Sequence, residues 1–239
     1  IMALPSIATP TYELSLPSSK KKIKYRPFLV KEEKILLLAT QSEEPKEVEE
    51  AVKTIVKSCV LSRIKLDDLT SFDLEYLFLN IRAQSVGEEV AMKITCDDDG
   101  TTKVDYTVDI TQVQVTFPEG HSNKIELTDN VGMIMRYPGM KEFVNYTMMG
   151  QNPEDPDEIF EVIAKCIDQI YEGEEVYDDS TTTMKEKIQF VEGLTQKQFE
   201  SVQAFFNTMP TLRHEFKVTN PNTGVESSYT LEGLQSFFG

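Results

Sequence analysis

Apolar and polar residues alternate in two short runs near the start of the chain, TYELSLP and KIKYRPF. A period of two is typical of strands that bury one face. Four prolines in the same segment favour extended backbone, because proline fixes φ and has no N–H to donate. We therefore expect residues 1–30 to be extended or to form a short hairpin, either free or packed on the rest of the chain.

Three stretches with helical periodicity follow. The first covers residues 30–40. The second begins at Pro45, a favoured first helical position, and keeps one apolar face as far as Cys59. The third begins near Thr70 and ends where Gly87 offers a stop. These stretches predict three helices in the first third of the chain.

A β-rich stretch covers residues 90–128. The runs VAMKITC and KVDYTVDI face each other across an Asp/Gly turn, and the runs QVQVTF and KIELT follow them. Alternating β-branched residues joined by polar turns predict a single meander of four strands.

Residues 131–150 contain five of the chain's nine methionines. Methionine adapts to irregular surroundings, so this stretch is interpreted either as loosely packed core or as a partner-binding surface. The candidate partner-binding residues here are Met133, Met135 and Met140.

The second half of the chain begins with another helical pattern. Asp155, Pro156 and Glu158 occupy the N-cap, first-turn and capping-partner positions. An apolar stripe then continues through Ile167 and Ile170. We expect one helix over the whole stretch.

A second capping box follows at Thr195 and Gln198, flanked by Leu194 and Phe199 as a hydrophobic staple. Its helix ends at Pro210. The chain then closes with the strands LRHEFKVT and VESSYT around the turn NPNTG, and with a short helix, LEGLQSFF.

The last hairpin is similar to the earlier one. When KITCDDDGTTKVDYTV is set over FKVTNPNTGVESSYTL, Cys96 falls on Asn220 and Gly100 falls on Gly224. Each hairpin follows about three helices, so the chain is either a diverged duplication or carries two unrelated hairpins with the same turn chemistry.

The predicted fold class is therefore α+β, with helices packed beside two small antiparallel β-hairpin sheets. We expect an extended basic segment at residues 1–30, a lobe of helices and meander at 31–150, and a lobe of helices and hairpin at 151–239.

The charge distribution narrows the class of partner. The chain has 24 basic and 40 acidic residues, which disfavours nucleic acid, because phosphate binding depends on Lys and Arg. Residues 1–66 carry 12 basic and 8 acidic side chains, and the remainder carries 12 and 32. This split indicates recognition of another protein, binding of one end of the chain to the other, or a solvated acidic surface.

The length of the apolar runs, the first residues and the cysteine spacing exclude other classes of protein. No apolar run approaches the length of a membrane helix, and the first residues lack the pattern of a secretory signal. Three distant cysteines indicate a reducing compartment rather than a disulfide framework. Cys59 and Cys166 fall on apolar faces and are predicted to be core residues.

Two charged segments supply the other candidate partner-binding residues. The basic set is Lys20, Lys21, Lys22, Lys24 and Arg26. The acidic set is Glu172, Glu174, Glu175, Asp178 and Asp179. The acidic run is interpreted as an exposed loop that binds cations weakly, docks a basic partner or is a solvated linker.

The turn TCDDDGTT at residues 95–102 raises the question of a metal. A zinc ribbon needs four thiolate or imidazole ligands, and only Cys96 stands here. A calcium loop centred on Gly100 would need Asp first and Glu twelfth, where the chain has Thr95 and Tyr106. An Asp-Gly hairpin turn explains the residues.

Catalytic motifs are absent from the sequence as well. There is no phosphate-binding glycine loop and no nucleophile elbow, and neither His121 nor His214 stands beside a candidate nucleophile. We therefore predict no catalytic residue, no metal ligand and no cofactor. The alternative is a metal-dependent hydrolase that uses the carboxylates of residues 97–99 or 172–179.

Several segments together resemble one protein family. They are TYELSLPSSKKKIKYRPFLVKEEKILLLA, EVEEAVKTIVKSCV, DLTSFDLEYLFLNIRAQSVGE, IDQIYEGEEVYDD and LEGLQSFFG. In this order the chain resembles the baseplate hub proteins and hub assembly chaperones of T-even-type contractile-tailed bacteriophages.

The resemblance implies a small, non-enzymatic late protein that binds other baseplate hub and tail proteins. It would act in the infected host cytoplasm or in the tail baseplate of the virion, as a transient chaperone or as a permanent structural component. It also implies cysteine pairs at the two hairpins in several members, of which this chain has only Cys96. Ordinary hairpin packing would then replace a metal clamp.

Overall fold

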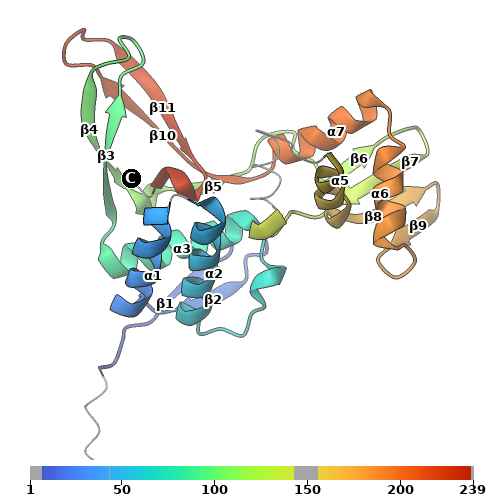
Figure 1. Ribbon diagram of the computed structural model, residues 1–239, viewed down its shortest axis with the longest axis horizontal. Helices are drawn as coiled ribbons and strands as arrows, with labels where there is room; N and C mark the ends of the chain where they lie inside the picture. Colours follow the sequence, from blue (N-terminus) through green and yellow to red (C-terminus); the bar gives the residue numbers. More distant parts are fainter. Residues whose placement is uncertain (1–6, 43, 143–155, 238–239) are drawn as a thin grey trace, which may run out of the picture. The chain divides into compact units, whose positions relative to one another are not determined.

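The computed structural model describes residues 7–42, 44–142 and 156–237. Within these ranges the chain forms helices and small antiparallel sheets, which confirms the α+β class. It divides into two compact units (Figure 1). Unit 1 comprises Ile1–Thr116 and Thr211–Gly239, and unit 2 comprises Phe117–Pro210.

Unit 1 contains three α-helices, three short 3₁₀ helices and seven strands among the described residues. The helices are α1 (Val30–Ser42), α2 (Pro45–Cys59), η1 (Leu66–Asp68), α3 (Ser71–Val86), η2 (Ile110–Gln112) and η3 (Leu234–Phe237). The strands are β1 (Tyr12–Ser15), β2 (Lys22–Tyr25), β3 (Glu89–Thr95), β4 (Lys103–Asp109), β5 (Gln114–Thr116), β10 (Thr211–Thr219) and β11 (Glu226–Glu232).

Helix α3 lies at the centre of the core of unit 1. The Thr70 hydroxyl caps it by accepting a hydrogen bond from the Asp73 amide at 3.2 Å. Gly87, with φ of 114°, lets the chain leave the helix in a direction that other residues rarely allow. The helix is buried over most of its surface, and α2 packs against it. Its buried apolar residues are Phe72, Leu74, Leu77, Phe78, Leu79, Ile81 and Ala83.

The strands of unit 1 confirm the predicted hairpins and correct the predicted meander. β1 pairs with β2, β3 with β4, and β10 with β11, all antiparallel. β5 does not continue from β4; it pairs with β10 instead. Between them, η2 buries Ile110 and leads into buried Val113, so the chain turns away from the edge of β4. The fourth predicted strand belongs to unit 2.

Among the described residues, unit 2 contains a four-stranded sheet in the order β6-β7-β8-β9, as well as helices. The strands are β6 (Lys124–Glu126), β7 (Val131–Met135), β8 (Ile167–Glu172) and β9 (Glu175–Asp178). The helices are α5 (Pro156–Lys165), α6 (Met184–Glu192) and α7 (Gln196–Asn207). The capping box at Thr195 and Gln198 is confirmed, and α6 begins with another, formed by Thr183 and Glu186.

The helix predicted to run through Ile170 is wrong in its second half. α5 ends at Lys165, and Ile167 and Ile170 lie in β8. Residues three apart in a regular strand point to opposite faces. Here Met135 pairs with Ile167 and Ile134 pairs with Gln169, so Asp168 is an extra, bulged residue. The bulge puts both isoleucines in the core, which imitates helical spacing. The predicted cap at Asp155 lies outside the described residues.

The two units do not match the lobes expected from the sequence. The lobes at 31–150 and 151–239 separate the final hairpin from the first half of the chain, whereas β10 pairs with β5 in unit 1. Unit 2 is therefore an insertion between two parts of unit 1. All three cysteines are buried and free, and the core positions predicted for Cys59 and Cys166 are confirmed.

Candidate docking surfaces

The N-terminal hairpin is packed on unit 1. The inward residues Ile23 and Tyr25 are buried, and Tyr25 forms an isolated β-bridge with Val60. In the turn of the hairpin, Ser18 donates its amide to Asp73 Oδ1 at 3.0 Å and its hydroxyl to Asp73 Oδ2. The buried Asp73 carboxylate at the start of α3 therefore fastens the hairpin to the central helix.

The opposite side of this hairpin is positively charged. Lys20, Lys21, Lys22 and Lys24 are exposed. Lys22 and Lys24 alternate with the buried residues of β2, so the pleat itself directs them outward. Residues 12–25 hold these four lysines and one glutamate, Glu13, which pairs with Lys22 at 3.2 Å. We call residues 12–25 the basic hairpin.

Arg26, the fifth residue of the predicted basic set, makes its contacts within the fold. Its guanidinium lies 3.0 Å from the Glu32 carboxylate and donates to the carbonyls of Pro27 and Ser58 at 2.8 and 3.0 Å. Burial alone would raise the pKa of Glu32, but hydrogen bonds from Arg26 and from the Leu29 amide leave that pKa below its ordinary value. Arg26 therefore joins β2 to α1 and α2, and its charge is used inside the fold.

The predicted acidic loop is a β-hairpin, β8–β9. Gly173, with φ of 60°, makes its turn, and Glu172, Glu174 and Glu175 are exposed around it. Residues 167–178 contain five carboxylates and no lysine or arginine. We call these residues the acidic hairpin. Its edge strand β9 gives the carboxylates a fixed backbone, which an unstructured linker would not.

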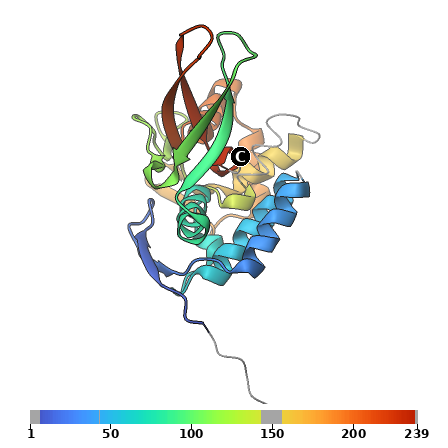
Figure 2. The same cartoon turned by 90° about the vertical axis from the view of Figure 1, so that its left-hand side faces the viewer.

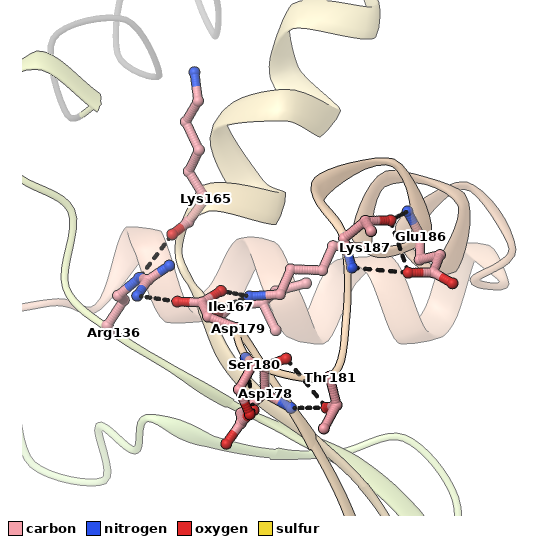
Figure 3. A network of polar contacts seen from close by, with 10 residues as sticks. Arg136, Lys165, Ile167, Asp178, Asp179, Ser180, Thr181, Glu186 and Lys187 are labelled. Atoms are coloured by element: carbon pink, nitrogen blue, oxygen red, sulfur yellow. Dashed lines mark hydrogen bonds and ion pairs between the residues drawn. The ribbon is translucent and has the colours of Figure 1, made fainter.

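Asp178 and Asp179, at the end of this hairpin, make contacts within unit 2. Asp178 Oδ1 accepts hydrogen bonds from the Ser180 hydroxyl and amide, and these bonds lower the pKa of Asp178. Asp179 lies between Arg136 and Lys187, at 3.0 and 2.5 Å (Figure 3). Lys187 is buried and also donates to the Ile167 carbonyl at 2.7 Å. The network ties β8, the turn after β9 and α6 together.

The candidate methionines lie in the interior. Met133 and Met135 are 0% and 1% exposed and belong to the core cluster of unit 2, and Met140 is also buried. Side chains in these positions have no surface to offer a partner, so the core interpretation fits them. Residues 143–150 of the methionine-rich stretch lie outside the described residues.

The turn with three aspartates is a hairpin tip, and it meets the tip of the β10–β11 hairpin (Figures 1 and 2). Asn220 donates to Asp98 and Asp99, and the Thr223 hydroxyl donates to Asp98. Further down, Tyr106 stacks on Phe216 with ring centroids 4.1 Å apart. Hydrogen-bonded side chains and stacked rings thus join the two hairpins. We call this contact the hairpin clasp.

The two turns of the clasp have the same backbone hydrogen bonds. The Gly100 amide donates to the Cys96 carbonyl, and the Gly224 amide donates to the Asn220 carbonyl, both at 2.8 Å. Both glycines have positive φ. The equivalence of Cys96 and Asn220 expected from the sequence therefore holds for the local geometry, and a duplication stays a prediction.

His121, in unit 2, lies between two hydroxyl groups. Its Nδ1 lies 2.9 Å from Thr208 Oγ1 and its Nε2 lies 3.1 Å from the Tyr137 hydroxyl. The Thr208 hydroxyl donates to the Ala204 carbonyl at 2.7 Å, so it accepts from His121 and cannot yield its proton to the imidazole. Burial lowers the pKa of His121, which favours the neutral ring. The arrangement is that of a packed neutral histidine, not of a nucleophile with its base.

Within the ranges that the structure describes, no three His, Cys, Asp or Glu side chains are grouped so that they could hold a metal ion. No described helix is long and apolar enough to span a bilayer. The carboxylates of Asp98 and Asp99, considered for a hydrolase, are hydrogen-bonded in the clasp.

Comparison with known proteins supplies the family. The model of a family described as T4 bacteriophage base plate protein matches residues 9–239. The chain belongs to this family. Neither the curated proteins nor the solved structures that were compared include a match.

A baseplate protein has a structural or assembly role in the phage tail and interacts with other tail proteins. It belongs to the virion tail or to the infected cell in which the tail is built. The family therefore confirms the phage baseplate part of the resemblance seen in the sequence. The exposed charged residues of the two hairpins are the candidate contacts with tail proteins.

Proposed function

We propose that this baseplate protein is a non-enzymatic assembly factor or component of the central baseplate hub, and that it acts by binding other hub and tail proteins. The N-terminal stretch TYELSLPSSKKKIKYRPFLVKEEKILLLA supports the hub, because it resembles the opening of hub proteins. The family match over residues 9–239 supports the baseplate.

The observation that carries the proposal is the construction of the basic hairpin. Ile23 and Tyr25 are buried beneath it, and Asp73 holds its turn, so apolar burial and a hydrogen-bonded carboxylate attach the hairpin to unit 1. The four lysines are exposed, two of them on β2, and exposed lysines are suited to a partner surface rich in carboxylates. The acidic hairpin of unit 2 offers the opposite charge to a second, basic surface.

Co-expression with each hub protein of the same phage, followed by affinity purification and size-exclusion chromatography, tests the proposal. We expect a stable complex with at least one hub protein, and weaker binding at higher salt, since exposed charges are screened. If no hub protein associates with the full chain at low salt, the proposal is wrong.

Mass spectrometry of purified phage particles separates the two forms of the proposal. A permanent hub component is present in every particle at a fixed ratio to the other hub proteins. A transient chaperone is present in infected cells and absent from finished particles.

A further inference from the structure

Helix α1 exposes an apolar strip. Glu32 and Ala39 are buried, whereas Val30, Leu37 and Leu38 are 80%, 56% and 56% exposed. With about 3.6 residues per turn, the three exposed residues lie on the side of the helix opposite to the two buried ones. We call Val30, Leu37 and Leu38 the α1 strip.

The neighbouring helix α2, which lies beside α1 in Figure 1, has the opposite character. Its exposed described residues are all polar: Lys46, Glu47, Glu50, Thr54, Lys57 and Ser58. Burial of aliphatic side chains removes apolar surface from water, so a strip of three such side chains favours contact with another surface. The α1 strip is therefore unlike the solvated side of an ordinary surface helix.

The charged residues in and beside the α1 strip favour one kind of partner over another. Lys34 is exposed and lies one turn after Val30 and one turn before Leu38, inside the strip. A second copy packed on it about a two-fold axis would bring Lys34 against its own counterpart as water is excluded, which is unfavourable. At the edges, Lys31 is exposed on one side and Glu33 on the other. A carboxylate facing Lys34 would remove the penalty of covering that ammonium.

We propose that the α1 strip docks an amphipathic helix of another baseplate protein. Apolar residues of that helix cover Val30, Leu37 and Leu38, and an Asp or Glu among them pairs with Lys34. This inference rests on the proposed function, binding of other baseplate proteins, and names the chemistry of one such partner.

The first test replaces Leu37→Gln and Leu38→Gln together, since glutamine keeps helix propensity and removes the apolar surface. Leu61→Gln is the matched control, because Leu61 is 53% exposed and lies outside α1. Each full-length variant is co-expressed with the individual baseplate proteins of the phage. We expect the double variant to bind its partner at least about tenfold more weakly, with the control unchanged and both melting temperatures within about 2 °C of the original. A large fall in the melting temperature of the double variant would mean that the strip is covered within the monomer, and would overturn the inference.

The second test identifies the occupant. A photo-reactive phenylalanine analogue at position 38 is crosslinked in the co-expressed complex, and the attached peptide is sequenced by mass spectrometry. We expect a segment of another baseplate protein with helical apolar periodicity and an acidic residue within it. Lys34→Glu should then abolish binding, and replacing that acidic residue of the partner by lysine should restore it. A crosslink to a second copy of this chain, or to a basic segment, overturns the inference.

The outcomes distinguish the two proposals. If the double variant binds every baseplate protein partner as well as the original chain does, the α1 strip is not the docking site and the proposed function stands. If the original chain binds no baseplate protein at all, the proposed function fails and the docking inference fails with it.

Discussion

Asn220 donates its side-chain amide to both carboxylate oxygens of Asp98, at 3.0 and 3.1 Å, across 122 residues of sequence. The same amide reaches Asp99 Oδ2 at 3.0 Å. Asn220 is 1% exposed, so water cannot replace these bonds without opening the tips of the two hairpins. The clasp therefore holds the turn between β10 and β11 to the turn between β3 and β4.

Asn220→Ala should loosen the clasp. The substitution removes the buried donor and leaves two carboxylates facing the space, so we expect the melting temperature to fall by roughly 2–6 °C. Asp97→Asn is the control, because the Asp97 side chain is exposed and makes no hydrogen bond within the described residues. Calorimetry of both variants checks the prediction; equal effects of the two would contradict it.

Acid should weaken the clasp through Asp99. Hydrogen bonds from the Thr102 hydroxyl, then from the Thr102 and Thr101 amides, hold the pKa of Asp99 well below its usual range. A carboxylate with a lowered folded-state pKa stabilises the fold above its ordinary pKa, near 3.8, and loses this contribution as the pH falls toward the folded-state value. Asp99→Asn should therefore melt below the original chain at about pH 7, and the gap should narrow below about pH 4. If the difference in melting temperature does not change with pH, ionisation of Asp99 does not contribute to it.

Glu75 should make the fold less stable as the pH rises. It is buried on α3, and burial raises its pKa to about 7, although the Leu234 amide opposes the shift. The folded chain thus holds this proton more tightly than the unfolded chain, whose ordinary value is 4.5. Stability is greatest below 4.5 and falls as the pH rises to about 7.

Glu75→Gln, which cannot ionise, should exceed the original chain in unfolding free energy at about pH 8, by at most about 3 kcal/mol. The advantage should shrink toward about pH 5. Urea unfolding at both values measures it, and a variant that is less stable at both would contradict the prediction.

Charge reversal of the basic hairpin should affect binding and not folding. We expect Lys20→Glu, Lys21→Glu and Lys22→Glu together to weaken association with the hub partner. The melting temperature should hardly change, because exposed pairs such as Lys22 with Glu13 contribute about 0–1 kcal/mol.

A control for these reversals is Lys185→Glu with Lys197→Glu, which reverses two exposed lysines in the first turns of α6 and α7. A negative charge is favourable there, because it faces the positive end of the helix dipole. A loss of binding in the control would show that net charge alone governs association.

Arg26→Met should have the opposite effect to the lysine reversals, because it should affect folding rather than binding. The substitution keeps an apolar stem but leaves the carboxylate of Glu32, which is 1% exposed, without its guanidinium. Removing one partner of a buried pair costs about 3–5 kcal/mol, so we expect a clear fall in unfolding free energy. Arg26→Met with Glu32→Leu removes both charges and should recover part of the loss. Failure of the double variant to recover would mean that the carbonyl contacts of Arg26 dominate.

Most local elements could be predicted from the sequence, because their signals lie within a few residues of one another. Thr195 and Gln198 stand three apart and cap the helix they precede, and Pro45 begins α2 as expected. The alternation of Ile23 and Tyr25 with lysines predicts β2. The same local patterns gave a wrong prediction for β8. There the bulge at Asp168 gives the two buried isoleucines of the strand the spacing expected in a helix.

The candidate docking surfaces could be predicted only in part from such local signals. Sequence indicated which segments are charged, but not which charges the fold uses. Arg26 is engaged by Glu32 and Asp179 by Lys187, and these partners lie 6 and 8 residues away in sequence on other elements. The sequence predicts a helix over residues 30–40, and only the exposed fractions of the α1 strip show that this apolar side faces outward.

The sequence by itself determined the α+β class, the caps, the hairpin turns and the basic and acidic segments, since each depends on the conformational preferences of neighbouring residues. The tertiary structure alone decided that β5 pairs with β10, that unit 2 interrupts unit 1, and that Asn220 meets Asp98. Such contacts form between distant segments when apolar faces are buried together. Many pairings would satisfy the same local pattern, and the packing of the whole core selects one.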